Sequence, residues 1–221
     1  MATSFEDLGE STSMAALKSR FAECPWWDNF REAESLNDEA PRVRLIEGPL
    51  ELDGDLHTGS DPWAVIVDGS LTLSGTLECY TEDARTSTLI VTGPVRAANL
   101  FFASAAQVWV GSLELSGFVI GTWGDSGAWL SSAGPLIARG VLLDSHTAAY
   151  GHPTQAIVLA GRGWQNLVPD IADGENALFV PEVRDRGGPF LNFHAARDAA
   201  KSGRPVFDVA QEASLRGRKG L

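Results

Sequence analysis

The chain has 221 residues, a mass of 23.6 kDa, 44% hydrophobic residues and a formal net charge of −12. That length suffices for one sizeable core, and no apolar stretch reaches the roughly 18 residues of a membrane-spanning helix. The strong negative charge disfavours direct binding to nucleic-acid phosphates. The two cysteines, Cys24 and Cys79, predict reduced thiols and not a disulfide framework. Because the acidic N-terminus does not have the pattern of a signal peptide, we expect a cytoplasmic protein.

Residues 1–44 are predicted to form an acidic N-terminal cap that contains one short helix. The first sixty residues carry 13 acidic and 5 basic side chains, a net charge of −8. Ser13 precedes an apolar face at helical spacing, which predicts a short amphipathic helix with Ser13 as its N-cap. An aromatic cluster follows, and we expect it to plug the open end of the first structural repeat; its members are Trp26, Trp27 and Phe30.

A nine-residue pattern then occurs five times, at starting intervals of 21, 24, 18 and 23 residues. It reads Gly, any, apolar, any, apolar, any, Gly or Asn, any, apolar. The alternation predicts short strands with one face inward, and the flanking glycines predict bends that need positive φ or close backbone approach. The predicted bend residues are Gly48, Gly54, Gly69, Gly75, Gly93, Asn99, Gly111, Gly117, Gly134 and Gly140. At Asn99 we expect a left-handed conformation, which asparagine tolerates best after glycine.

Repeated coils of this length predict an all-β protein with a single-domain parallel β-helix, or solenoid, over residues 45–168. We expect about five to six coils, a right-handed winding and short helical caps at both ends. A β-sandwich also has short strands and frequent turns, but it has no reason to repeat one bend chemistry at one coil length. Two interior ladders are predicted, Leu50/Leu71/Val95/Leu113/Leu136 and Leu52/Leu73/Ala97/Leu115/Ala138.

Residues 169–221 are predicted to form a C-terminal segment with a helix over 192–202 and a basic tail. Asn192 is suited to cap that helix, and Gly203 followed by Pro205 ends it. The tail ends in Arg216, Arg218 and Lys219, and we expect it to be frayed.

The sequence contains no nucleophile elbow, Walker loop or dinucleotide fingerprint, so we expect no enzyme and no cofactor. Asp144, His146 and His152 lie close together after the fifth repeat, but their spacing matches no strong zinc signature. We therefore predict no metal, and leave open whether these three residues form a site.

Partner-contact residues are predicted in two loops that combine acidic and aromatic side chains. The glycine-rich stretch 121–127 reads as a protruding loop, and an earlier long bend carries several carboxylates. Outward tryptophan beside carboxylate is typical of protein or sugar recognition. The predicted contact residues are Trp123, Asp125, Glu78, Glu82 and Asp83.

The repeated Gly-Pro/Ser pattern over residues 45–145 resembles that of cytoplasmic bacterial β-solenoid proteins. It is similar to immunity proteins encoded beside polymorphic toxins and, more distantly, to the polymer-forming bactofilins. The closing stretch 202–207, Ser-Gly-Arg-Pro-Val-Phe, also looks like the immunity-like group. The resemblance implies a non-enzymatic protein, and the substantial caps predicted here are unlike the short tails of bactofilins.

The leading functional prediction is a protein-binding module, most concretely an immunity protein that neutralises a bacterial toxin domain by covering its active site. A net charge of −12 favours a basic protein partner, which long-range attraction would steer into contact. We expect no nucleic acid and no membrane among its partners. Two alternatives are a carbohydrate-binding or carbohydrate-active β-helix and a bactofilin-like structural scaffold.

Overall fold

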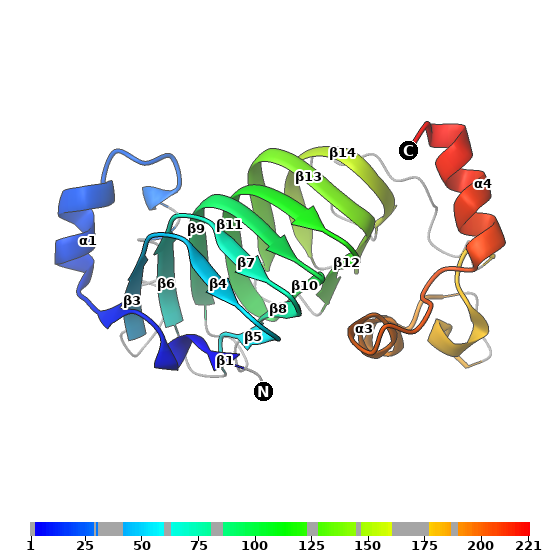
Figure 1. Ribbon diagram of the computed structural model, residues 1–221, viewed down its shortest axis with the longest axis horizontal. Coiled ribbons are helices and arrows are strands. Elements are labelled where there is room, and N and C mark those ends of the chain that lie inside the picture. The colour runs from blue at the N-terminus through cyan, green and yellow to red at the C-terminus, as the bar shows by residue number, and fades with distance from the viewer. Residues whose placement is uncertain are drawn as a thin grey trace.

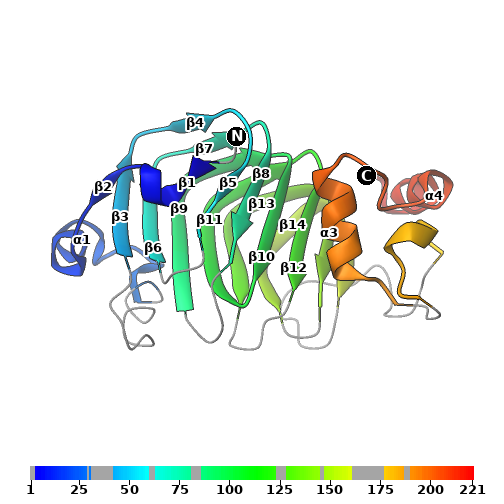
Figure 2. The same ribbon diagram turned by 90° about the horizontal axis from the view of Figure 1, so that it is seen from below.

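The computed structural model describes residues 3–28, 30, 42–59, 63–80, 86–122, 128–144, 147–160, 177–186 and 190–221. Parallel strands stack into a β-solenoid of about five turns, with short helices towards both ends (Figures 1 and 2). This confirms the predicted fold class. The β-strands account for most of the regular structure. Each coil, one full turn of the chain around the solenoid axis, forms backbone hydrogen bonds with the next coil along that axis.

The described elements follow one another in three groups. The N-terminal group comprises β1 (Thr3–Ser4), the 3-10 helix η1 (Phe5–Asp7), β2 (Glu10–Ser11) and α1 (Met14–Phe21). The solenoid strands are β3 (Arg42–Glu47), β4 (Leu50–Leu52), β5 (Leu56–His57), β6 (Trp63–Asp68), β7 (Leu71–Leu73), β8 (Thr76–Cys79), β9 (Thr86–Ala97), β10 (Asn99–Ala103), β11 (Ala105–Leu115), β12 (Phe118–Thr122), β13 (Trp129–Leu143) and β14 (Ala148–Ala160). The C-terminal group comprises η2 (Pro181–Val183), α3 (Phe193–Lys201) and α4 (Val209–Lys219). The predicted domain boundary at residue 168 lies outside the described residues.

Strand register divides the solenoid into three stacked parallel faces. The first face runs through β3 and β6 into the opening segments of β9, β11, β13 and β14. The second face runs through β4 and β7 into the closing segments of β9 and β11 and the middle of β13 and β14. The third face runs through β5, β8, β10 and β12 into the closing segments of β13 and β14. Long strands such as β13 therefore contribute to all three faces.

The first predicted interior ladder is confirmed along the second face. Register pairs Leu50 with Leu71, Leu71 with Val95, Val95 with Leu113 and Leu113 with Leu136. From the second coil onward these side chains are buried, while Leu50 is partly buried at the end of the stack. Members of the second predicted ladder join the same core cluster. Because each fully buried aliphatic side chain stabilises the fold by roughly 1.5–3 kcal/mol, these ladders hold successive coils together.

The bend glycines serve the two purposes predicted for them. Gly48 and Gly54 have φ of 77° and 97°, in the left-handed region that favours glycine. Gly75 and Gly111 are needed for close approach, since a Cβ on Gly75 would lie 2.5 Å from the Gly54 carbonyl carbon and oxygen. A Cβ on Gly111 would lie 2.8 Å from the Gly93 oxygen. At Gly75 and Gly111, glycine thus stacks on the backbone of the preceding coil with no room for a side chain.

Asn99 corrects one sequence prediction, because it does not adopt the left-handed conformation expected of it. Ser104, with φ of 58°, is the non-glycine residue with positive φ in the described part of the chain. The third coil is one residue shorter at this point, so Ala98 takes the position of Gly75 and its N–H donates to the Gly75 carbonyl at 2.8 Å. Asn99 instead joins neighbouring coils: its Nδ2 donates to Thr76 Oγ1 at 3.2 Å, and its Oδ1 accepts from the Phe118 N–H at 3.0 Å.

The N-terminal group covers the outer side of the first face. Ser13 caps α1 as predicted, with its Oγ accepting from the Ala16 N–H at 3.3 Å. The prediction that the aromatic cluster plugs the first coil is wrong. Trp26, Trp27 and Phe30 are buried in a cluster with outward side chains of the first face, and the ring of Trp26 lies 6.3 Å from that of Trp109 in β11. Phe5 from η1, 1% exposed, joins the interior core in their place.

The C-terminal group covers the outer side of the third face. The predicted helix over 192–202 is confirmed as α3, and Asn192 Oδ1 accepts from the Ala195 N–H at 2.9 Å. Phe207 is fully buried in a second apolar cluster, with its ring 5.0 Å from Phe118 of β12. Helix α3 contacts β10 and β12, and Figure 2 shows it beside β12 on this face. Two of the three faces are therefore covered by the ends of the chain.

The predicted basic tail is not frayed, and this expectation is corrected. The last residues form α4, which begins at its N-cap Asp208 and ends before Gly220, whose φ is 72°. Asp208 Oδ1 accepts from the N–H groups of Ala210 and Gln211 at 3.1 and 3.0 Å. These contacts satisfy N–H groups that have no partner within the first turn of a helix.

Candidate functional site

In the described part of the chain, neither the N-terminal group nor the C-terminal group covers the outer side of the second face, except where α4 approaches its last coils. Its outward side chains form one row along the stack: Glu51, Thr72, Arg96, Glu114, Ile137 and Gln155. Arg96 Nε lies 2.9 Å from Glu114 Oε2, and both side chains are 57% exposed. So exposed a pair adds little stability, which leaves both groups open to an approaching molecule.

A shallow groove runs beside this row, where the second face turns into the third. It consists of two adjoining hollows of about 360 and 350 Å³ that share Leu115, Ser116 and Ile137. The first hollow is completed by Ala138, Arg139, Gln155, Glu212 and Arg216, and the second by Leu73, Ser74, Arg96, Ala97, Ala98 and Glu114. The groove mixes apolar floor with charged walls, as surfaces that recognise other molecules commonly do.

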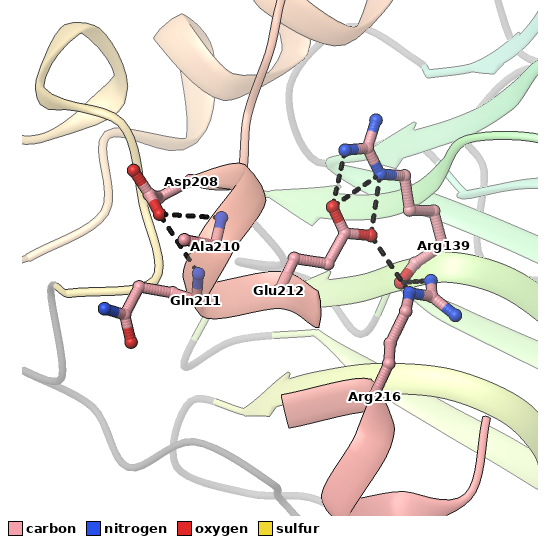
Figure 3. Close-up of polar contacts among 6 residues, drawn as sticks. All are labelled: Arg139, Asp208, Ala210, Gln211, Glu212 and Arg216. Carbon is pink, nitrogen blue, oxygen red and sulfur yellow. Dashed lines mark hydrogen bonds and ion pairs between the residues drawn. The ribbon is translucent and has the colours of Figure 1, made fainter. Parts of the chain in front are cut away.

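Helix α4 closes the C-terminal end of the groove through one buried carboxylate (Figure 3). Arg139 Nε donates to Glu212 Oε1 and Oε2 at 2.8 and 3.1 Å, and its Nη2 donates to Oε2 at 2.5 Å. Arg216, one turn later in α4, donates from Nε to Glu212 Oε1 at 3.0 Å and from Nη2 to the Arg139 carbonyl at 2.9 Å. Lys219 Nζ reaches the Ala156 carbonyl at 2.9 Å.

Ionic contact outweighs burial at this carboxylate. Burial alone would raise the pKa of Glu212, but hydrogen bonds from Arg139 and Arg216 hold that pKa below its ordinary value. The hydrogen bond to Glu212 in turn raises the pKa of Arg139 against the opposing effect of burial. Glu212 is the buried residue of α4, and Leu215 adds partly buried apolar contact. The helix is therefore attached mainly through charge.

We expect Glu212→Gln to weaken the docking of α4 by about 2 kcal/mol, because bonds to charged groups contribute about 1.5–3 kcal/mol. With the pKa of Glu212 lowered on folding, its stabilising effect is complete above the ordinary carboxyl pKa of about 4.3 and is lost as the pH falls through the lower folded value. Amide hydrogen exchange of α4 measured against pH checks this. The wild type should lose protection on acidification, and the variant should show the same reduced protection at every pH, while the exposed Glu182→Gln should behave as the wild type.

The N-terminal end of the stack carries a concentration of exposed carboxylates. These are Glu6, Asp7, Glu10, Glu47, Glu51 and Asp53. Two arginines lie near them: Arg20 pairs with Glu47 and Asp68, and Arg44 Nη1 donates to the Leu8 and Gly9 carbonyls at 3.1 and 3.4 Å. The acidic character expected of the N-terminal segment is thus displayed on the surface around the first coil.

The predicted contact residues fall into two groups. Glu78 in β8 is 8% exposed and pairs with Lys201 of α3, which also lies 3.5 Å from Asp55. Burial opposes the charge of Lys201, but contact with Glu78 and Asp55 raises its pKa overall. The carboxylate of Glu78 thus anchors α3 and is not part of an open surface. The other predicted residues, Trp123, Asp125, Glu82 and Asp83, lie outside the described residues.

Of the three residues left open as a site after the fifth repeat, Asp144 lies among the described residues. Asp144 accepts a hydrogen bond from Thr147 Oγ1 at 3.3 Å, whereas His146 and the side chain of His152 lie outside the described residues. Among described residues, no group of three or more histidine, cysteine, aspartate or glutamate side chains could hold a metal ion. Cys24 and Cys79 are free thiols, and burial raises the pKa of Cys79, which keeps its thiol protonated.

The contact between Arg139 and Glu212 of α4 was not predicted from the sequence. Glu212 and Arg216 are one helical turn apart, and Asp208 is a residue type that often caps a helix at its N-terminus. These two features indicate a helix over this segment. No local signal pairs them with Arg139, which lies 73 residues earlier in the chain.

Comparisons with known proteins identify no relative of this chain. No protein-family model matches the chain, and neither the curated proteins nor the solved structures contain a match. In the described part of the chain, no helix is long and apolar enough to cross a membrane.

Proposed function

We propose that this protein is a non-enzymatic binding module for a basic protein partner, most concretely an immunity protein that neutralises a bacterial toxin domain in the cytoplasm. The observation that carries the proposal is the exposed acidic end of a rigid stack. Carboxylates at this end outnumber the nearby arginines, two of which are already engaged. Such a surface attracts a basic partner before contact and speeds association.

The uncovered second face supports the same proposal. The two other faces are buried beneath the ends of the chain, whereas this face displays a row of side chains from Glu51 to Gln155 that is polar except at Ile137. A partner docked at the acidic end can extend along it. Neutralisation would then follow from steric occlusion of the partner's active site.

The direct test is copurification with the product of the neighbouring gene, followed by a growth assay in cells that express that product. We expect a stable complex and protection of the cells. Failure of the two proteins to bind, together with failure to protect, would contradict the proposal.

Charge variants test the surface itself. The triple variant Glu10→Gln, Glu51→Gln and Asp53→Asn should slow association with the partner by about tenfold at low salt, with a much smaller effect at high salt. The matched control is Glu182→Gln, Asp185→Asn and Asp198→Asn, which removes the same charge from exposed positions of the C-terminal group. If both triple variants slow association equally, net charge and not the acidic end controls binding.

A carbohydrate-binding function is the second candidate, and the groove beside the second face favours it. Its two hollows offer Ser74, Ser116 and Arg96 along an open channel. A glycan array would show specific binding that Arg96→Ala removes, since Arg96 lines the groove and is 57% exposed. Absence of any specific glycan would exclude this candidate and leave the protein-binding proposal unaffected.

The scaffold alternative requires coils to stack end to end between molecules. At the N-terminal end, β1 pairs with β5, β2 pairs with β3, and Phe5 fills the interior of the first coil. We therefore expect sedimentation to show no growth of filaments as the concentration rises. Concentration-dependent assembly would revive the scaffold alternative.

A further inference from the structure

At the N-terminal end of the stack, two of the three strands of the first coil, β3 and β5, have a strand paired to their outer edge. The N-terminal segment pairs with β5 through β1, passes Phe5 into the interior, and then pairs with β3 through β2. It thus crosses the open end from the third face to the first face and does not run along the second. Figure 2 shows β1 and β2 on either side of this crossing, with β4 at the edge.

Strand β4 is left with a free edge in the described part of the chain, since it pairs there only with β7. The Leu50 N–H donates to the Ser70 carbonyl at 2.8 Å, and the Leu52 carbonyl accepts from the Ser74 N–H at 3.3 Å. In a parallel ladder, alternate residues direct their backbone groups to opposite neighbours. The N–H and C=O of Glu51 therefore point away from the stack.

We propose that this free edge of β4 accepts one extended segment of a basic protein partner, which adds a strand to the second face. Strand addition to an exposed edge is a general mode of peptide recognition. The choice of a basic occupant rests on charge: Glu51 and Asp53 are exposed on β4 and directly after it. This inference rests on the proposed function and names its docking site.

A second copy of the chain is a poorer fit to the same edge. Pairing two β4 strands would bring Glu51 and Asp53 of one molecule against the same residues of the other. Like charges directly opposite one another destabilise paired strands. The carboxylates therefore discourage self-association while they attract a segment rich in lysine or arginine.

The test uses a fluorescent peptide of alternating lysine and valine as the probe and compares two variants of the full chain. Glu51→Gln removes the charge and keeps the outward N–H, whereas Glu51→Pro removes both. Since the Glu51 N–H bonds to no other coil, proline at this edge position should leave the stack intact, which circular dichroism and thermal unfolding check. We expect the wild type to bind the peptide and Glu51→Pro to bind about tenfold more weakly than Glu51→Gln.

Two control peptides separate strand pairing from plain charge attraction. A peptide of the same charge with proline at its centre should bind at least about tenfold more weakly, since it cannot pair as a strand. A peptide of alternating glutamate and valine should not bind. Equal binding of the lysine peptide by Glu51→Pro and Glu51→Gln would overturn the proposal, and so would concentration-dependent dimerisation of the wild type that Glu51→Pro abolishes.

Amide hydrogen exchange of the wild type keeps the proposal testable if Glu51→Pro fails to fold. The Glu51 amide should exchange rapidly in the free protein and become protected when the lysine peptide is added. No change in its exchange at saturating peptide would overturn the inference. Failure of this docking site can be distinguished from failure of the proposed function. If a basic partner binds the wild type and Glu51→Pro equally, the proposed function stands and only this docking site is removed.

Discussion

Gly111→Ala should lower the free energy of unfolding by about 2–3 kcal/mol, because the added methyl group has no space between coils. Its Cβ would lie 2.7 Å from the Thr92 oxygen and 2.8 Å from the Gly93 oxygen. Both are backbone atoms of the preceding coil, held by the parallel ladder, so neither can rotate aside as a flexible side chain would. Unfolding in urea, followed by tryptophan fluorescence, measures the effect.

Gly217→Ala is the matched control for this substitution. Gly217 lies inside α4, has no positive φ, and has no atom within 4 Å of the position that a Cβ would take. Alanine should therefore stabilise the helix by about 0.5–1 kcal/mol. If both substitutions shift the unfolding midpoint alike, the close stacking of glycines contributes nothing specific to stability.

Phe207→Ala should produce the largest loss among single truncations of the C-terminal group, about 3–5 kcal/mol. The side chain is fully buried, with its ring 5.0 Å from Phe118 and 5.7 Å from Phe179. Gly140 of β13 leaves the space that Phe207 occupies, since a Cβ there would lie 2.8 Å from its Cζ. Truncation would leave a cavity beneath α3 that the rigid strands cannot close.

Two measurements separate local from global effects of this change. Hydrogen exchange should rise first in α3, while urea unfolding reports the loss for the whole molecule. Phe190→Ala provides the control, because Phe190 is 51% exposed and its removal should change stability by no more than about 0.5 kcal/mol. A similar loss for both variants would show that the buried aromatic cluster does not anchor the C-terminal group.

The solenoid itself could be predicted because its physical requirements repeat along the sequence. The apolar position occupied by Leu71 and its counterparts recurs at nearly one interval, and stacked glycines leave a regular signature. The same regularity caused the error at Asn99. A strict nine-residue template cannot accommodate a coil that is one residue shorter. The register shows that Ala98, and not Asn99, takes the bend position of Gly75.

The cover of the faces and the candidate site were harder to predict, because both depend on contacts between distant segments. Trp26 has no local feature that selects the outside of β11 over the end of the stack, and Glu78 reads as a surface carboxylate until Lys201 covers it. The free edge of β4 likewise follows from the path of the N-terminal segment and not from the residues of β4. Periodicity predicts the ladders, but tertiary contacts decide which surfaces stay open.

The two covers also limit how freely this solenoid can fray or change length. In a simple stack, each coil contacts only its neighbours, so terminal coils can open and repeats can be added or lost. Here Trp26 reaches Trp109 across several coils, and Lys201 reaches back 123 residues to Glu78. Loss or insertion of one coil would pull both contacts out of alignment. The number of coils is thereby constrained, and the coils of the solenoid should unfold as one cooperative unit.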